Sequence, residues 1–155
     1  MKKYLYLLLL FLLVSCAGSV PDGHARVVRL FPREIAIQAP NGLFVSINSD
    51  RRLVADKREL KEASVFRVVN MNGDFWGLLG ENGYYVAADR NKKNQLIARS
   101  DQVTWWEKFL EVKKDNGKIA IVASDAKYIA LDSNQILTAM EGEYNNTCLF
   151  KLIDL

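Results

Sequence analysis

The sequence predicts an all-β fold, a β-trefoil with twelve strands in three pseudo-symmetric repeats of about 42 residues. Three observations carry this prediction. Apolar residues recur in register in three copies, they alternate at spacing two within each copy, and turn-forming residues separate the alternating runs. The copies occupy about residues 34–74, 75–117 and 118–155, so the predicted domain is 34–155.

The apolar columns of the three copies lie 41 or 43 residues apart. They are Ile35, Trp76 and Ile119; Ile37, Leu78 and Ile121; Phe44, Tyr85 and Tyr128; Val45, Val86 and Ile129; Leu53, Leu96 and Leu137; Ala55, Ala98 and Ala139; and Phe66, Phe109 and Phe150. One copy cannot bury its apolar face alone, so the three must assemble around a common core. We expect these columns to form the layers of that core, and we assign Trp76 and Trp106 to it.

Repeat two shows the expected strand order most clearly. Its four apolar runs are FWGLL, YYVAAD, QLIARS and WWEKFLEVK, which begin at residues 75, 84, 95 and 105. A propeller blade also has four strands at this period, but three blades are fewer than the four to eight that close a ring. In a β-trefoil, two strands of each repeat build a six-stranded barrel and the other two form a hairpin that caps it.

Asn-Gly pairs begin at residues 41, 72, 82 and 116. Two-residue type I′ hairpin turns favour this pair because both central residues need positive φ. Repeat three has Asp125-Ala126 at the first of these turns, so we expect that turn to differ. The segment KRELKEAS, residues 57–64, carries a weak helical pattern and is expected to be a loop between two strands.

The N-terminal segment has the features of a secretory signal. Two lysines precede an apolar run of eleven residues, 4–14, which is shorter than the roughly 20 residues that span a membrane. Leu13-Val14-Ser15-Cys16 resembles the lipobox of bacterial lipoproteins. The resemblance implies a signal peptide at 1–15, acylation of Cys16, and a tether at 16–33 that joins a membrane anchor to the domain. An ordinary signal peptide cut near Ala17 is the alternative.

The lipoprotein reading also gives a location, the cell envelope. Ala17 follows the acylated cysteine, where aspartate would favour retention in the inner membrane, so we expect the outer membrane. After removal of Lys2 and Lys3 the 21 basic and 18 acidic residues leave a net charge of +1, which does not favour a nucleic-acid partner. The sequence leaves the oligomeric state open.

Catalytic and metal-binding groups are scarce. The single histidine, His24, lies in the tether, so a serine or cysteine triad and a histidine metal site lack their ligands, and no cofactor is expected. Two carboxylate pairs, Glu81 with Asp89 and Glu107 with Glu111, are conceivable for glycoside hydrolysis, but charged residues at strand ends are more often solvated. We expect no enzyme activity. Cys148, next to Leu149 and Phe150, is expected to be a buried thiol.

The repeats resemble the fascin-like β-trefoil domain. The segments NGYYVAAD, QLIARS and WWEKFLEV match that family's repeat of Gly-Lys-Tyr-Val, Leu-x-Ala and Trp-Glu-x-Phe, and only repeat two has the last pattern complete, as Trp106, Glu107 and Phe109. The resemblance covers residues 34–155 and implies the fold. Fascin-like domains bundle actin in animal cells, and related domains accompany carbohydrate-active enzymes in bacteria, which implies glycan binding by analogy.

Candidate ligand-binding residues lie where repeat two departs from its siblings. Trp105 aligns with Glu62 and Asn146, and Tyr84 aligns with Leu43 and Lys127. An exposed aromatic ring suits stacking on a sugar or a protein hot spot. We therefore predict one shallow glycan site made by Trp105, Tyr84, Asp89 and Asn94.

Several alternatives to this site remain. Trp105 could simply cover the barrel rim, and the basic loop DRNKKN, residues 89–94, could be ordinary soluble surface. The Gln-x-Trp signature of ricin-type lectins is absent, because Gln102 and Trp105 are one residue too far apart. The alternative function is a protein-interaction or structural lipoprotein that faces the envelope or a host, and protease inhibition is a third.

Overall fold

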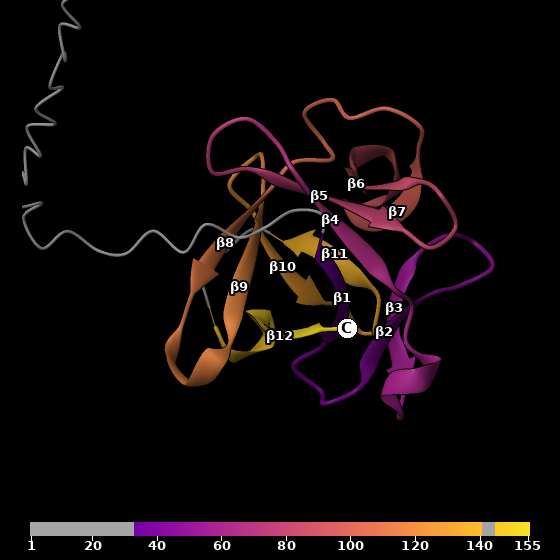
Figure 1. The fold of residues 1–155 in the computed structure, drawn as a ribbon, viewed down its shortest axis with the longest axis vertical. Coiled ribbons are helices and arrows are strands. Elements are labelled where there is room, and N and C mark those ends of the chain that lie inside the picture. The colour runs from indigo at the N-terminus through magenta and orange to yellow at the C-terminus, as the bar shows by residue number, and fades with distance from the viewer. Residues whose placement is uncertain (1–32, 141–144) are drawn as a thin grey trace, which may run out of the picture.

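Within the described residues, 33–140 and 145–155, the computed structural model contains twelve strands (Figure 1). They are β1 (Arg33–Gln38), β2 (Phe44–Ile47), β3 (Leu53–Lys57), β4 (Phe66–Asn70), β5 (Trp76–Gly80), β6 (Tyr85–Asp89), β7 (Gln95–Ser100), β8 (Phe109–Lys113), β9 (Ile119–Ala123), β10 (Tyr128–Leu131), β11 (Leu137–Met140) and β12 (Leu149–Asp154). The predicted signal peptide, Cys16, and the predicted tether up to residue 32 lie outside the described residues.

Six of these strands form a closed barrel. Each pairs antiparallel with two neighbours in the cyclic order β1, β4, β5, β8, β9, β12 and back to β1. Closure leaves no open sheet edge in the barrel. The other six strands form three hairpins, β2–β3, β6–β7 and β10–β11. The predicted β-trefoil, with two barrel strands and one hairpin from each repeat, is confirmed.

The three hairpins are joined to one another by a cyclic set of backbone hydrogen bonds. In each hairpin, the alanine two residues after the core leucine donates its backbone N–H to a backbone carbonyl in the turn of another repeat. The bonds are Ala98 N to Arg51 O at 2.8 Å, Ala139 N to Asn94 O at 2.9 Å, and Ala55 N to Gln135 O at 2.9 Å. Arg51, Asn94 and Gln135 all have positive φ, near 60°. This left-handed conformation lets each turn carbonyl reach the neighbouring hairpin.

The apolar columns form the core, with one exception. The three phenylalanines Phe66, Phe109 and Phe150 are fully buried, as are Leu53 and its counterparts in the other repeats. Full burial of each such side chain stabilises the fold by about 1.5–3 kcal/mol. The column of Phe44, Tyr85 and Tyr128 is only half-buried. Their neighbours Val45, Val86 and Ile129 take the core positions instead, and the strand pairing shifts register by a bulge at two of these steps.

The Asn-Gly turns differ from the predicted type I′ geometry at three of the four positions. At residues 41, 72 and 82 only the glycine has positive φ, whereas both Asn116 and Gly117 do. Gly42 N donates to Ala39 O at 2.9 Å and Ala39 N donates to Leu43 O at 2.8 Å. These bonds define a three-residue loop in which a type I turn is followed by a left-handed glycine.

The first turn of repeat three keeps this same geometry, so the expectation of a different turn is wrong. Ala126 N donates to Ala123 O at 2.9 Å, and Ala126 itself has a φ of 64°. The strand pairs on either side fix the loop conformation, and alanine tolerates it at a cost.

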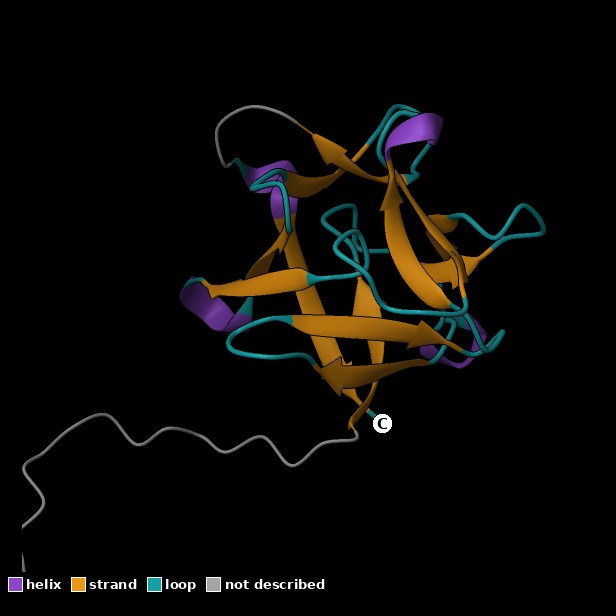
Figure 2. Ribbon diagram, turned by 90° about the horizontal axis from the view of Figure 1, so that it is seen from above, coloured by secondary structure: helices purple, strands orange, loops and turns teal. Residues whose placement is uncertain are grey.

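Among the described residues, the loops carry four short 3₁₀ turns, which lie at the periphery of the strands (Figure 2). They are η1 (Leu60–Glu62), η2 (Arg90–Lys92), η3 (Asp115–Gly117) and η4 (Asn146–Cys148). The segment 57–64 is thus the end of β3 followed by a loop with one 3₁₀ turn. Cys148 is a free, buried thiol, as predicted. No helix among the described residues has the length and apolar character to span a membrane.

Candidate functional site

Trp105 is a large apolar side chain held at the surface. It is 49% exposed, and the equivalent positions, Glu62 and Asn146, are exposed too. Its ring contacts Phe75 at a centroid distance of 5.9 Å with the planes tilted by 55°, and the Lys108 ammonium lies 5.7 Å from the ring centroid. The indole is therefore supported by Phe75 and Lys108, and about half of its surface is open to solvent.

Glu107 fixes the loop that carries Trp105. Its carboxylate is 4% exposed and accepts hydrogen bonds from Ser100 Oγ at 2.6 Å, Thr104 N at 2.8 Å and Thr104 Oγ1 at 2.8 Å. Lys108 N also donates to Trp105 O at 3.3 Å. These bonds bend the chain before the barrel strand, so β8 begins at Phe109 rather than at Trp105 as predicted.

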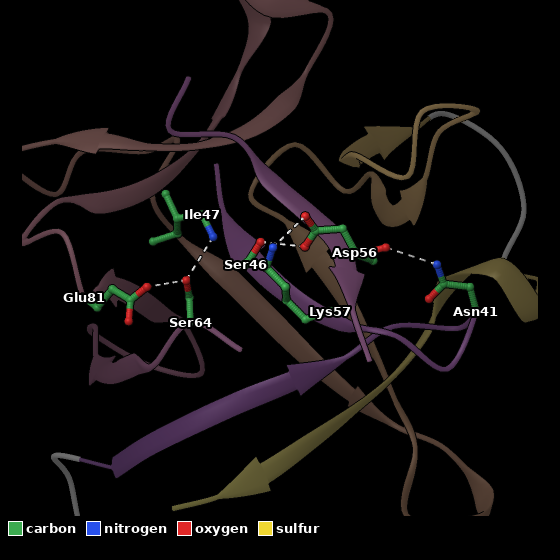
Figure 3. Close-up of polar contacts among 8 residues, drawn as sticks. Asn41, Ser46, Ile47, Asp56, Lys57, Ser64 and Glu81 are labelled. Atoms are coloured by element: carbon green, nitrogen blue, oxygen red, sulfur yellow. Dashed lines mark hydrogen bonds and ion pairs between the residues drawn. The ribbon is translucent and has the colours of Figure 1, made fainter. Parts of the chain in front are cut away.

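In repeat one, the loop before the equivalent barrel strand, β4, is fixed by residues from two repeats. Ser64 occupies the position of Glu107; its hydroxyl accepts from Ile47 N at 2.9 Å and donates to the carboxylate of Glu81 (Figure 3). In the same view, Ser46 Oγ donates to Asp56 Oδ1 at 2.7 Å. Repeat one thus takes its carboxylate, Glu81, from repeat two, whereas repeat two takes Glu107 from the loop that carries Trp105, the tryptophan loop.

Trp106 is half-buried, and its assignment to the core is wrong. Its side chain is not part of the core cluster, and the guanidinium of Arg90 covers its ring at 4.5 Å from the centroid. The backbone O of Trp106 accepts from Ala88 N at 3.0 Å, which ties the loop to β6. Trp76 is buried beside Phe109, as predicted.

A turn of repeat three completes this surface. Asp125 lies in a small hollow with Ser124, Arg90 and the two tryptophans. Its Oδ2 is 3.7 Å from Arg90 Nη2 and 3.3 Å from Lys127 Nζ. The Arg90 side chain is therefore oriented both by an aromatic face and by a carboxylate.

A cavity of about 190 Å³ lies beside Trp106. It is lined by Ala87, Asp89, Asn91, Arg99, Trp106 and Glu107. Asp89 is 1% exposed, and its Oδ2 is 2.8 Å from Arg99 Nη2. The cavity thus has an aromatic wall and a charged wall.

Two of the four predicted ligand residues have a structural role. Asp89 Oδ1 accepts from Asn91 N at 2.9 Å, and Asn48 and Asp132 hold the equivalent hairpin turns in the same way. Asn94 is one of the three left-handed turn residues that join the hairpins. Both types are common at such positions because their side chains bond the local backbone and tolerate positive φ.

The structure separates Tyr84 from the rest of the predicted site. Tyr84 precedes β6 and Asp89 ends it, so the two lie roughly 16 Å apart along the strand. The Tyr84 ring is covered by the guanidinium of Arg51 at 4.6 Å. Trp105, Asp89 and Asn94 lie at the other end of the hairpin, the end that Arg90 and Trp106 occupy.

Sequence reasoning did not assign four contributors to this surface: Phe75, Arg90, Arg99 and Asp125. Arg90 belongs to the basic loop 89–94, and the basic composition of this loop was the sequence feature that could have identified it. The others come from separate elements that only the fold brings together. Within the described residues, no group of three potential metal-ligating histidine, cysteine or carboxylate side chains occurs.

The fold and this surface define a β-trefoil domain with one asymmetric aromatic site. No protein-family model matches the chain, and no curated protein sequence matches it. Among solved structures, the chain is similar to a designed 3-fold symmetric protein, ThreeFoil, at 11% identity with a TM-score of 0.68, over 79% of this chain and 99% of that one.

A second similar structure is the GlcNAcα1-4Gal-releasing endo-β-galactosidase from Clostridium perfringens. The identity is 18% and the TM-score is 0.65, over 79% of this chain and 32% of that chain. The match therefore concerns about a third of that enzyme. At these identities the two likenesses establish the β-trefoil fold.

Proposed function

We propose that this domain is a non-catalytic carbohydrate-binding module whose site is built on Trp105 and Trp106. The observation that carries the proposal is the 49% exposure of Trp105, at a loop position where the other repeats have polar side chains. A flat indole face stacks on the apolar face of a sugar ring with little loss of conformational entropy.

The rigidity of the tryptophan loop supports this proposal. Phe75 backs the indole of Trp105, the carboxylate of Glu107 pins Thr104, and Trp106 is bonded to β6. A loop ordered before binding loses less entropy on binding. The adjacent 190 Å³ cavity offers hydrogen-bonding groups next to the stacking face.

The absence of catalysis is part of the proposal. The carboxylates of Asp89 and Glu107 are buried and already engaged, with Arg99 and with Ser100 and Thr104. A general acid and a nucleophile need carboxylates open to the glycosidic bond. The similarity to part of an endo-β-galactosidase supports a carbohydrate partner, since that enzyme acts on a glycan.

We also propose that the domain is displayed on the cell envelope through a lipid on Cys16, most simply at the outer membrane. The support is the basic start, the apolar run 4–14 and the lipobox-like Leu13-Val14-Ser15-Cys16. Two residues of the Trp-Glu-x-Phe pattern that resembles fascin-like domains, Trp106 and Glu107, line the cavity of the proposed site.

A glycan-array screen of residues 17–155 tests the proposal. This form is appropriate because β1 and β12 pair and close the barrel within residues 33–155. We expect selective binding to a group of glycans, weakened at least about tenfold by Trp105→Ala, since loss of a hot-spot aromatic costs about 1.4 kcal/mol or more. The matched control is Leu60→Ala, which removes another exposed apolar side chain, 40% exposed, from a loop of repeat one.

Two results would contradict the proposal. One is that no glycan binds the folded domain. The other is that binding survives Trp105→Ala unchanged. In the first case, capture of an envelope or host protein by the same surface, again dependent on Trp105, would establish the protein-interaction function instead.

A further inference from the structure

Both basic and acidic side chains surround the two tryptophans. Residues 33–155 contain 17 basic and 17 acidic side chains, so the domain as a whole is neutral. Around the two tryptophans the balance is six basic to five acidic side chains. The basic residues are Arg90, Lys92, Lys93, Arg99, Lys108 and Lys127, and the acidic residues are Asp74, Asp89, Asp101, Glu107 and Asp125. The site is therefore distinguished by where its basic groups lie rather than by a large excess of positive charge.

The acidic side chains that line the two hollows beside the tryptophans are more buried than the two arginines there. Asp89 and Glu107 are 1% and 4% exposed, and Asp125 is 18% exposed. By contrast, the side chains of Arg90 and Arg99 are 52% and 47% exposed. Within these hollows the guanidinium groups of Arg90 and Arg99 are thus more accessible to a ligand than the carboxylates of Asp89, Glu107 and Asp125.

The arginines are held in fixed orientations. Arg90 lies against the Trp106 ring and beside Asp125, and Arg99 is paired with buried Asp89. Each guanidinium has five N–H donors, more than these contacts use, and its planar fork matches a carboxylate or a sulfate. Lys108 adds an ammonium group near the Trp105 ring.

We propose that the ligand of this site is an acidic saccharide, one that carries carboxylate or sulfate groups. The inference rests on the proposed carbohydrate-binding function and specifies its ligand class. The sugar ring stacks on Trp105, and its acidic groups are held by Arg90, Arg99 and Lys108. Arg90 and Lys108 determine the preference for charge, and Trp105 determines binding to the ring.

The test compares saccharides that differ only in charge. One pair is a galacturonate oligosaccharide and its fully methyl-esterified form; the other is a sulfated galactan oligosaccharide and its desulfated form. Binding of residues 17–155 is measured by calorimetry at low and high salt. We expect the acidic member of at least one pair to bind about tenfold more tightly at low salt, with the difference reduced at high salt.

The variants are Arg90→Gln, Lys108→Gln and, as the matched control, Lys118→Gln, an exposed lysine outside the site. We expect the first two to reduce affinity for the acidic saccharide about fivefold each and to reduce affinity for the neutral form by a smaller factor, so that the preference for the charged member falls. The control is expected to bind as wild type does.

Failure of this inference is distinguishable from failure of the proposed function. Equal binding of charged and neutral members, lost in Trp105→Ala, would overturn the acidic ligand and leave the carbohydrate-binding module intact. Acidic binding that is insensitive to Arg90→Gln, Lys108→Gln and Trp105→Ala would overturn it as well, because the contact would lie elsewhere. Binding of no saccharide in either pair or on the array would overturn both.

Discussion

Replacement of Glu107 by alanine should destabilise the domain by about 3 kcal/mol. The carboxylate accepts three hydrogen bonds, at 2.6, 2.8 and 2.8 Å, and each bond to a charged acceptor contributes about 2 kcal/mol. Roughly half of that total is offset, because water can reach Thr104 and because the variant no longer buries a charge. Repeat two alone depends on this residue, since Ser64 and Cys148 occupy its position elsewhere.

Urea unfolding of Glu107→Ala measures this loss. With a slope of about 1.5 kcal/mol per molar urea, we expect the midpoint to fall by about 2 M. Hydrogen exchange at the Thr104 amide gives a local readout, because this N–H donates to Glu107 in the wild type. We expect it to exchange much faster in the variant. Glu62→Ala, an exposed glutamate at the position of Trp105, is the control and should change stability by no more than about 0.5 kcal/mol.

A small midpoint shift together with unchanged protection of the Thr104 amide would refute this reasoning. It would mean that packing of Phe75 and Trp106, rather than the carboxylate, holds the tryptophan loop. The carboxylate of Glu107 would then not be what orders the binding site before a ligand arrives.

Three further predictions concern the turns, the core and the anchor. Ala126→Gly should stabilise the domain by about 1 kcal/mol in thermal unfolding, because it relieves a φ of 64°; an unchanged melting temperature would contradict the turn assignment. Phe109→Ala should cost about 4 kcal/mol by denaturant titration, since the ring is fully buried, and a loss below about 1.5 kcal/mol would be inconsistent with the core position. Cys16→Ser should abolish fatty-acid labelling and membrane retention in bacterial cells, whereas Cys148→Ser should keep both; retained labelling in the first variant would rule out the anchor.

The barrel was predictable because its determinants repeat. Phe66, Phe109 and Phe150 occupy the same buried position three times, so each copy tests the alignment of the others. The turns were less predictable, because an Asn-Gly pair fits both a two-residue loop and the last two positions of a three-residue loop. The strand pairing on either side decides between them, and this depends on residues far along the chain.

The site was only partly predictable. Trp105 stands out because it breaks a column of polar residues. Asp89 and Asn94 each perform the same backbone task as their counterparts in the other repeats, and the sequence does not separate this task from the predicted ligand role. Asp125 carries no local signal, because it meets Arg90 only when repeat three folds against repeat two. In a repeat protein, a residue that differs between repeats indicates function only when it does not perform a turn role that the other repeats share.

The pairing of β1 with β12 constrains when this protein can fold. Ile35 lies opposite Asp154, so the barrel cannot close until β12 has been synthesised. Until then β1 lacks one of its barrel neighbours, and a chain dominated by such distant pairings folds slowly. A chain with this topology therefore stays incompletely folded until its last barrel strand is available.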